Sequence, residues 1–104
     1  ADLAEVYATD KDLEPGTVVC FGGEKEVTSC DSELSHAVAG VVSTDPAYVM
    51  NHEQKGIKVC LALAGRVPCK VIGRVKKGDM LTTSATPGYA VKALNPTAVL
   101  FELL

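Results

Sequence analysis

A strict alternation of residue types between Ile57 and Ala64 constrains the fold of this chain more than any other feature. Apolar residues with large side chains occupy every second position, and small or polar residues occupy the positions between them. A period of two is typical of a β-strand that buries one face. The large apolar positions are Ile57, Val59, Leu61 and Leu63, and the intervening ones are Lys58, Cys60, Ala62 and Ala64.

The residues that follow predict that this strand turns back on itself. The triplet Ala64-Gly65-Arg66 has the composition of a reversal, and a second apolar run over 67–72 comes after it. Gly73 ends that run, and the pair Gly78-Asp79 marks another turn. We therefore expect a β-hairpin over 57–72, followed by a tight, glycine-punctuated crossover.

The rest of the chain carries turn signals every eight to twelve residues or so, which is the spacing of an all-β sandwich or barrel. No stretch shows a sustained helical period. The predicted fold class is therefore all-β, a small β-sandwich or barrel built of short hairpins. Besides the central hairpin, the expected strands lie at 17–21, 26–30, 37–42, 48–50, 81–83, 89–93 and 99–104.

The length of 104 residues predicts one domain with a single hydrophobic core. Residues 1–14 are expected to form an extended arm and its loop, and residues 15–93 the core. Residues 94–104 are expected to form a C-terminal strand. The apolar end of that strand is predicted to pair within the domain or with a neighbouring chain.

Composition argues against several classes of partner. The formal net charge of −3 leaves no basic stripe for nucleic acid. No apolar run approaches the roughly 20 residues that cross a bilayer, and no charged-then-apolar leader of the signal-peptide kind opens the sequence. With three tyrosines, two phenylalanines and no tryptophan, the chain is poorly equipped to stack on sugars or bases.

The four cysteines are spaced too widely for the close pairs that zinc sites usually present. A four-cysteine site assembled across two hairpins is one alternative. If the central hairpin turns at Ala64-Gly65, Cys60 and Cys69 lie opposite each other and could form a disulfide. The corresponding match of Cys20 with Cys30 is off register. The interpretation that we favour is four small, buried, reduced thiols on strands.

No constellation of side chains predicts catalysis, a metal site or a cofactor. Ser35-His36 has Asp31 and Glu33 nearby, but adjacent residues on one loop rarely reach triad geometry, and no nucleophile elbow surrounds the serine. His52-Glu53 lies in another polar loop. The acidic residues of 10–14 do not fit a calcium loop, and Gly22-Gly23 lacks the lysine and helix of a phosphate-binding loop.

Proline at position 68 predicts that the second apolar run is an edge strand or carries a bulge, because proline cannot donate to a β-ladder. An edge beside an alternating strand is where another subunit can add. A cluster of basic residues follows it, and lysines on an edge also discourage indiscriminate sheet pairing. The candidate assembly edge comprises Val67, Pro68, Lys70, Ile72, Arg74, Lys76 and Lys77.

Five motifs in this order resemble a module of bacteriophage virion proteins, similar to segments of long tail fibres and related structural proteins of large tailed phages, including those that infect cyanobacteria. The resemblance covers about Asp2 to Ala93, and residues 94–104 depart from it. The motifs are D-L-A-E-V-Y, P-G-T-V-V-x-F-G-G-x-K-E-V-T, A-G-V-V-S-T-x-P-A-Y-x-M-N, L-x-G-R-V-P-C-K-V-x-G-x-V-x-K-G-D-x-L and S-A-T-P-G-Y-A.

The resemblance implies a non-enzymatic, β-rich structural module of a tail fibre or similar filament, assembled in the host cytoplasm and located in the virion. Its partners would be copies of itself, as a trimer or filament, and other virion proteins, without nucleic acid or membrane. More distantly, the part A-G-V-V-S-T-D-P-A-Y-V-M-N is similar to self-cleaving chaperone domains of phage tail spikes. Those domains use carboxylates, and no catalytic pair maps onto this sequence.

Two alternatives remain beside the tail-fibre interpretation. A capsid decoration or cement protein would also be a compact β-module with many glycine and valine residues. An autoproteolytic chaperone domain would be cut from a longer precursor near Ala1, with a carboxylate such as Asp45 or Asp79 required for cutting. Receptor or glycan binding has little support with so few aromatic residues.

Overall fold

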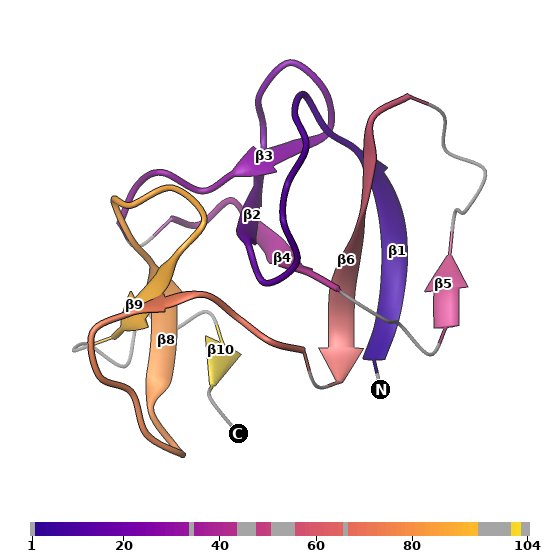
Figure 1. Cartoon of the computed structure of the whole chain (residues 1–104). Helices are drawn as coiled ribbons and strands as arrows, with labels where there is room; N and C mark the ends of the chain where they lie inside the picture. The colour runs from indigo at the N-terminus through magenta and orange to yellow at the C-terminus, as the bar shows by residue number, and fades with distance from the viewer. Residues whose placement is uncertain are drawn as a thin grey trace.

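The computed structural model describes residues 2–33, 35–43, 48–50, 56–65, 67–93 and 101–102. This part of the chain is all-β, as predicted, and none of it forms a helix long and apolar enough to cross a membrane. Its strands fall into two sheets (Figure 1). The strands are β1 (Asp2–Ala8), β2 (Val18–Phe21), β3 (Val27–Ser29), β4 (Val38–Val42), β5 (Tyr48–Met50), β6 (Lys58–Gly65), β7 (Val71–Ile72), β8 (Met80–Thr83), β9 (Ala90–Lys92) and β10 (Phe101–Glu102).

The larger sheet has six strands in the order β3-β2-β4-β6-β1-β5. All neighbours in it are antiparallel except β1 and β5, which run parallel. The sheet curls back on itself, because Thr9, just after β1, forms a parallel bridge with Val27 of β3. The backbone N–H of Glu26 also donates to the carbonyl oxygen of Ala8 at 3.1 Å. Five of the six strands therefore approach a small barrel, and the apolar cluster that packs together in it is Val19, Val27, Val42, Val59 and Leu61.

The smaller sheet has the order β10-β8-β9-β7 and lies beside the lower part of the larger one (Figure 1). Strands β8 and β9 pair antiparallel, and β7 joins the other side of β9 in parallel. On the far side of β8, Phe101 of β10 pairs with Leu81. The C-terminal strand thus pairs within the domain, as expected for its described residues.

A second apolar cluster joins the two sheets. Its buried members come from β2, β4, β8 and β9 and from Cys30 after β3, and the segment 67–75 packs half-buried against them. Strand β2 contributes to both clusters, because Val18 and Cys20 point to one face and Val19 to the other. A strand that is covered on both faces needs a continuous apolar run, which is what Val18-Val19-Cys20 supplies. The second cluster consists of Val18, Cys20, Cys30, Val41, Leu81 and Ala90.

Two glycine turns join the sheets through backbone hydrogen bonds. The N–H of Val18 donates to the carbonyl of Gly88 at 2.8 Å, and the N–H of Gly88 donates to the carbonyl of Cys30 at 2.9 Å. The carbonyl oxygen of Gly16 accepts a hydrogen bond from the N–H of Lys70 at 2.8 Å. The N–H of Gly16 donates to the carbonyl oxygen of Val42 at 2.9 Å. The Pro-Gly turns that the sequence marks are therefore the links between the two sheets.

The predicted central hairpin is wrong. Strand β6 pairs with β1 and β4, whereas β7 belongs to the other sheet and pairs with β9. Residues 67–70 form no strand, and Pro68 in that segment has no N–H to offer a ladder. The long partner of β6 is β1, which the sequence predicted as an extended arm. This segment is extended, but it lies inside the sheet with Ala4 and Val6 buried, because β5 and β6 flank it on both sides.

We predict that Gly88→Ala destabilises the protein more than Gly73→Ala does. Both glycines have positive φ, +81° and +78°, so either alanine carries a backbone penalty of about 1 kcal/mol. A Cβ on Gly88 would also lie 2.7 Å from Cγ2 of Thr17, whereas a Cβ on Gly73 meets nothing within 4 Å. We expect an additional loss of about 1–3 kcal/mol for Gly88→Ala in urea unfolding.

The double variant Thr17→Ser with Gly88→Ala tests the cause of that additional loss. Serine lacks the methyl group that the new Cβ would meet, so part of the stability should return. Equal losses for Gly88→Ala and Gly73→Ala would contradict the close contact.

Candidate functional site

The surface that the sequence marked as an assembly edge lies at the end of the smaller sheet. Strand β7 pairs with β9 on one side and is the last strand in the sheet order. The predicted strand over 67–72 is reduced to the two residues of β7, and Pro68 precedes it; among the described strands, β7 is a terminal strand of its sheet. We call the exposed residues of this segment the basic edge: Pro68, Ile72, Arg74, Lys76 and Lys77.

Side chains of this segment alternate between the core and the surface. Val67, Cys69, Val71 and Val75 pack half-buried against the cluster between the sheets. Ile72 points the other way and leaves 37% of its surface exposed. The alternation fixes the outward residues in place, because each inward neighbour is held by the core. Of the predicted edge residues, Val67 therefore belongs to the core.

Lys70 is also engaged within the chain. Its Nζ lies 3.0 Å from Oε1 of Glu14 and 5.6 Å from the centre of the Tyr89 ring. The Glu14 side chain is 80% exposed, so this ion pair adds little stability. The ion pair holds the ammonium group of Lys70 beside Glu14 and Tyr89, so Lys70 is not part of the basic edge.

Asp79 holds the turn that carries the lysines. Its Oδ2 accepts a hydrogen bond from the N–H of Lys76 at 2.9 Å, and its own N–H donates to the Lys76 carbonyl at 3.0 Å. The Nζ of Lys92 lies 3.9 Å from Oδ1 of Asp79, and Asp79 is buried. This carboxylate thus has a structural role in shaping the basic turn. Asp45, the other candidate of the self-cleaving alternative, lies outside the described residues.

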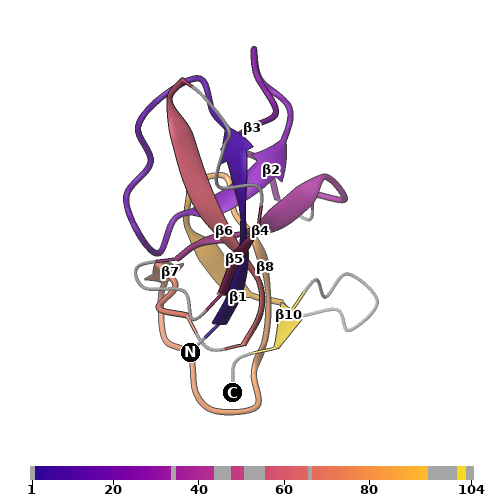
Figure 2. The ribbon, with the colours of Figure 1, turned by 90° about the vertical axis from the view of Figure 1, so that its right-hand side faces the viewer.

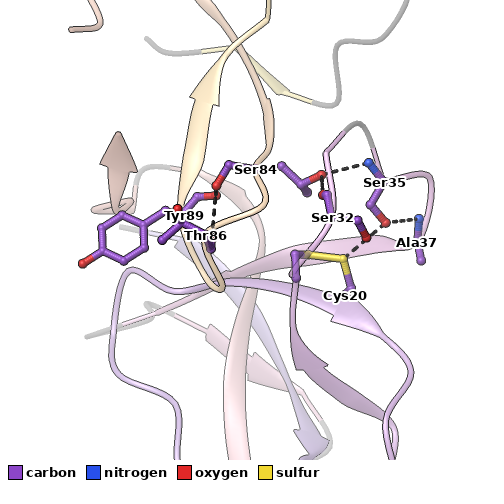
Figure 3. The surroundings of a disulfide bond; sticks show 9 residues. Cys20, Ser32, Ser35, Ala37, Ser84, Thr86 and Tyr89 are labelled. Carbon is purple, nitrogen blue, oxygen red and sulfur yellow. Dashed lines mark hydrogen bonds between the residues drawn. A yellow bond between two sulfur atoms is a disulfide. The ribbon is translucent and has the colours of Figure 1, made fainter. Parts of the chain in front are cut away.

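The loop at Ser35-His36 supports the fold. The N–H of Ser35 donates to Oγ1 of Thr83 on β8 at 2.8 Å, and Thr83 donates in turn to the carbonyl of Ser32 at 2.7 Å (Figure 3). The Ser35 hydroxyl oxygen accepts from the N–H of Ala37 at 3.1 Å and lies 3.5 Å from Sγ of Cys20. His36 is exposed, and the bonds of Ser35 and Ser32 with Thr83 link this loop to β8 of the smaller sheet. His52-Glu53 lies outside the described residues.

The cysteine interpretation needs a correction. The structure has a disulfide between Cys20 and Cys30, and Cys60 and Cys69 are free thiols (Figure 3). Because the central hairpin does not form, Cys60 lies on β6 of the larger sheet and Cys69 beside the smaller one. In the β2–β3 ladder Cys20 lies opposite Thr28, so Cys30 is its diagonal neighbour on the same face, with the Cα atoms 5.0 Å apart. The sequence signal that could have predicted this disulfide is the place of Cys30 diagonally across the first hairpin from Cys20.

No group of three His, Cys, Asp or Glu side chains in the described ranges could hold a metal ion. The pKa of the Cys69 thiol is raised to about 11 by burial, which keeps it protonated at neutral pH. A protonated thiol is a poor nucleophile and a poor metal ligand. The described residues thus combine a structural disulfide, a protonated half-buried thiol and one well-supported exposed edge.

Comparison of the chain with models of protein families, with curated proteins and with solved structures finds no match.

We predict that removing the disulfide with Cys20→Ala and Cys30→Ala lowers the free energy of unfolding by about 2–4 kcal/mol, because the cross-link restricts the unfolded chain. Both cysteines are buried in the cluster between the sheets, so lost packing adds to the effect. The matched control is Cys60→Ala, which removes a free thiol. Urea unfolding of each variant gives the comparison, and equal losses would contradict the role of the cross-link.

We also predict that iodoacetamide modifies Cys69 in the folded protein about a hundredfold more slowly at neutral pH than a thiol of ordinary pKa. The rate should keep rising with pH well beyond 9, since the thiolate forms only near the raised pKa. Mass spectrometry of the labelled peptide measures it, with urea-unfolded protein as the reference. A rate that levels off near pH 9 would contradict the raised pKa.

Proposed function

We propose that this chain is a non-enzymatic structural module of a bacteriophage tail fibre or similar virion filament, and that it acts by associating with copies of itself. The observation that carries the proposal is that β7 is a terminal strand with no strand on its outer side among the described residues. That edge presents exposed side chains from a segment whose inward side chains are fixed in the core. An edge of this kind provides free backbone groups to which a neighbouring chain can add a strand.

The motifs that resemble virion proteins support the proposal because their residues form the apolar clusters and link the two sheets. Their apolar residues supply Val18 and Val19 of β2, Val41 and Val42 of β4, and the inward residues of 67–71. Their glycines include Gly16 and Gly88, which link the sheets. These motifs are thus explained by folding and packing, as expected of a module whose purpose is to be built into an assembly.

The basic residues on the edge narrow the choice of partner. Lysine and proline on an edge strand oppose indiscriminate pairing, because a strand that carries like charges is repelled. Three exposed cationic side chains follow β7 directly, so this edge favours a partner surface of opposite charge. A capsid cement protein could use the same surface, and immunolabelling of particles separates the two by location on the head or on a tail appendage.

We predict that Ile72→Lys reduces self-association and that Ile57→Lys does not. Both isoleucines are exposed, with 37% and 50% of their surface accessible, but Ile72 lies on the basic edge and Ile57 beside β6 of the other sheet. A lysine at position 72 removes apolar contact and adds a fourth cation to the edge. Sedimentation velocity over a concentration series into the micromolar range measures the associated fraction.

Circular dichroism and urea unfolding should show both variants folded, because both side chains are exposed. A wild-type protein that stays monomeric throughout the series would overturn the proposed function.

A further inference from the structure

The disulfide between Cys20 and Cys30 lies at the junction of the two sheets. The smaller sheet lies to the left of β2 and β4 in Figure 1, and β8 overlaps with β4 and β6 in the side view of Figure 2. Both cysteines are buried, with exposed fractions of 7% and 1%, and they pack in one cluster with Leu81 and Ala90 of the smaller sheet. The apolar cluster inside the larger sheet contains no cysteine. The state of the S–S bond therefore bears on the junction more than on the larger sheet.

The backbone of Cys30 is tied to both sheets by hydrogen bonds. Its N–H donates to the carbonyl oxygen of Val18 at 3.1 Å, and its carbonyl oxygen accepts from the N–H of Gly88 at 2.9 Å. Cys30 directly follows β3, where the ladder with β2 ends. The disulfide is the covalent link that holds Cys30 against β2, so the hydrogen bond to the Gly88 turn depends on it.

An exposed loop beside the disulfide is held to β8 by one hydroxyl group. We call it the gate loop: residues 31–33 and 35–37, most of which are exposed. Oγ1 of Thr83 accepts a hydrogen bond from the N–H of Ser35 at 2.8 Å and donates to the carbonyl oxygen of Ser32 at 2.7 Å (Figure 3). Thr83 itself is buried, so this hydroxyl is a fixed anchor for the loop.

The gate loop lies against the disulfide through Ser35, whose Oγ is 3.5 Å from Sγ of Cys20 (Figure 3). A buried disulfide reacts with a dissolved reductant only when the structure around it opens. Segments with few buried contacts open at the lowest free energy. Release of the exposed gate loop from Thr83 is therefore the opening that costs least beside these sulfurs.

We infer that the Cys20–Cys30 disulfide is a redox-sensitive lock on the junction of the two sheets, covered by the gate loop that Thr83 holds closed. A dithiol reduces the lock. One of its thiolates attacks one sulfur, the S–S bond breaks, and the other cysteine leaves as a thiolate that takes up a proton. The second thiol then closes a ring disulfide within the reagent and releases the first cysteine, so two electrons and two protons pass to the protein. The lock persists in oxidising surroundings and is lost where thiols are kept reduced.

Two neighbouring threonines of β8 test the role of the gate loop. Thr83→Val removes the hydroxyl that holds the loop, whereas Thr82→Val removes a buried hydroxyl without a hydrogen-bond partner in the described part of the chain. We expect dithiothreitol to reduce the folded Thr83→Val protein about tenfold faster than the wild type or Thr82→Val. Thr83→Ser keeps the hydroxyl and should stay near the wild-type rate. Timed alkylation of the released thiols with mass spectrometry measures each rate.

Gly73→Ala is the control for a change in global stability, because it carries a backbone penalty and its new Cβ meets nothing within 4 Å. Circular dichroism of the oxidised variants verifies that each is folded before the reductant is added. Reduction of Thr83→Val at the rate of Thr82→Val or of Gly73→Ala would overturn the role of the gate loop.

Hydrogen exchange tests the lock itself, with the oxidised protein compared to the protein kept in excess dithiothreitol. The amides of Gly88 and Lys70 donate across the junction, and reduction should speed their exchange about tenfold or more. The amides of Thr9 and Glu26 donate within the larger sheet and should change less. An equal change at all four amides, or none at Gly88 and Lys70, would overturn the lock. None of these measurements depends on self-association, so the lock and the proposed function can fail separately.

Discussion

Strand β2 is the constraint on which the rest of the structure depends, because it is buried on both faces. Val19 packs into the curved larger sheet, whereas Val18 and Cys20 pack toward the smaller one. Two small apolar clusters thus share one strand. In a chain of this size neither cluster alone buries a large area, and their joint stability follows from the shared strand. The disulfide from Cys20 to Cys30 and the bonds of Gly88 with Val18 and Cys30 all reinforce the same place.

This arrangement explains why the polar residues with catalytic potential have structural roles. Where two sheets meet, buried backbone and hydroxyl groups need hydrogen-bond partners. Ser35 and Thr83 join the loop before β4 to β8, and the carboxylate of Asp79 satisfies the turn before it. Lys70 is separated from the other basic residues by its ion pair with Glu14 and its position beside the Tyr89 ring. Among the described residues, the terminal strand β7 has exposed side chains beside inward neighbours that the core holds.

The sequence predicted local features well and partnerships between distant segments poorly. Alternation and Pro-Gly signals located most strands, because these signals depend on neighbouring residues. The pairing of β6 with β1 joins Ala8 to Lys58, and no local pattern encodes it. The disulfide was missed for a related reason. Cys20 and Cys30 are off register for a direct cross-strand match, whereas the twist of a hairpin brings diagonal neighbours such as these two together.

The cations that follow β7 bear on a general hazard of sheet edges. Edge strands are a hazard, and lysine on an edge is one of the devices that keep proteins monomeric. The same charge becomes a specificity device when the partner edge is acidic, because the repulsion that rejects a like edge becomes attraction toward an unlike one. Arg74, Lys76 and Lys77 are exposed in the segment that follows β7, where they can select a partner surface in this way. Under the proposed function, these cations would therefore disfavour indiscriminate pairing at β7 and favour a partner surface of opposite charge.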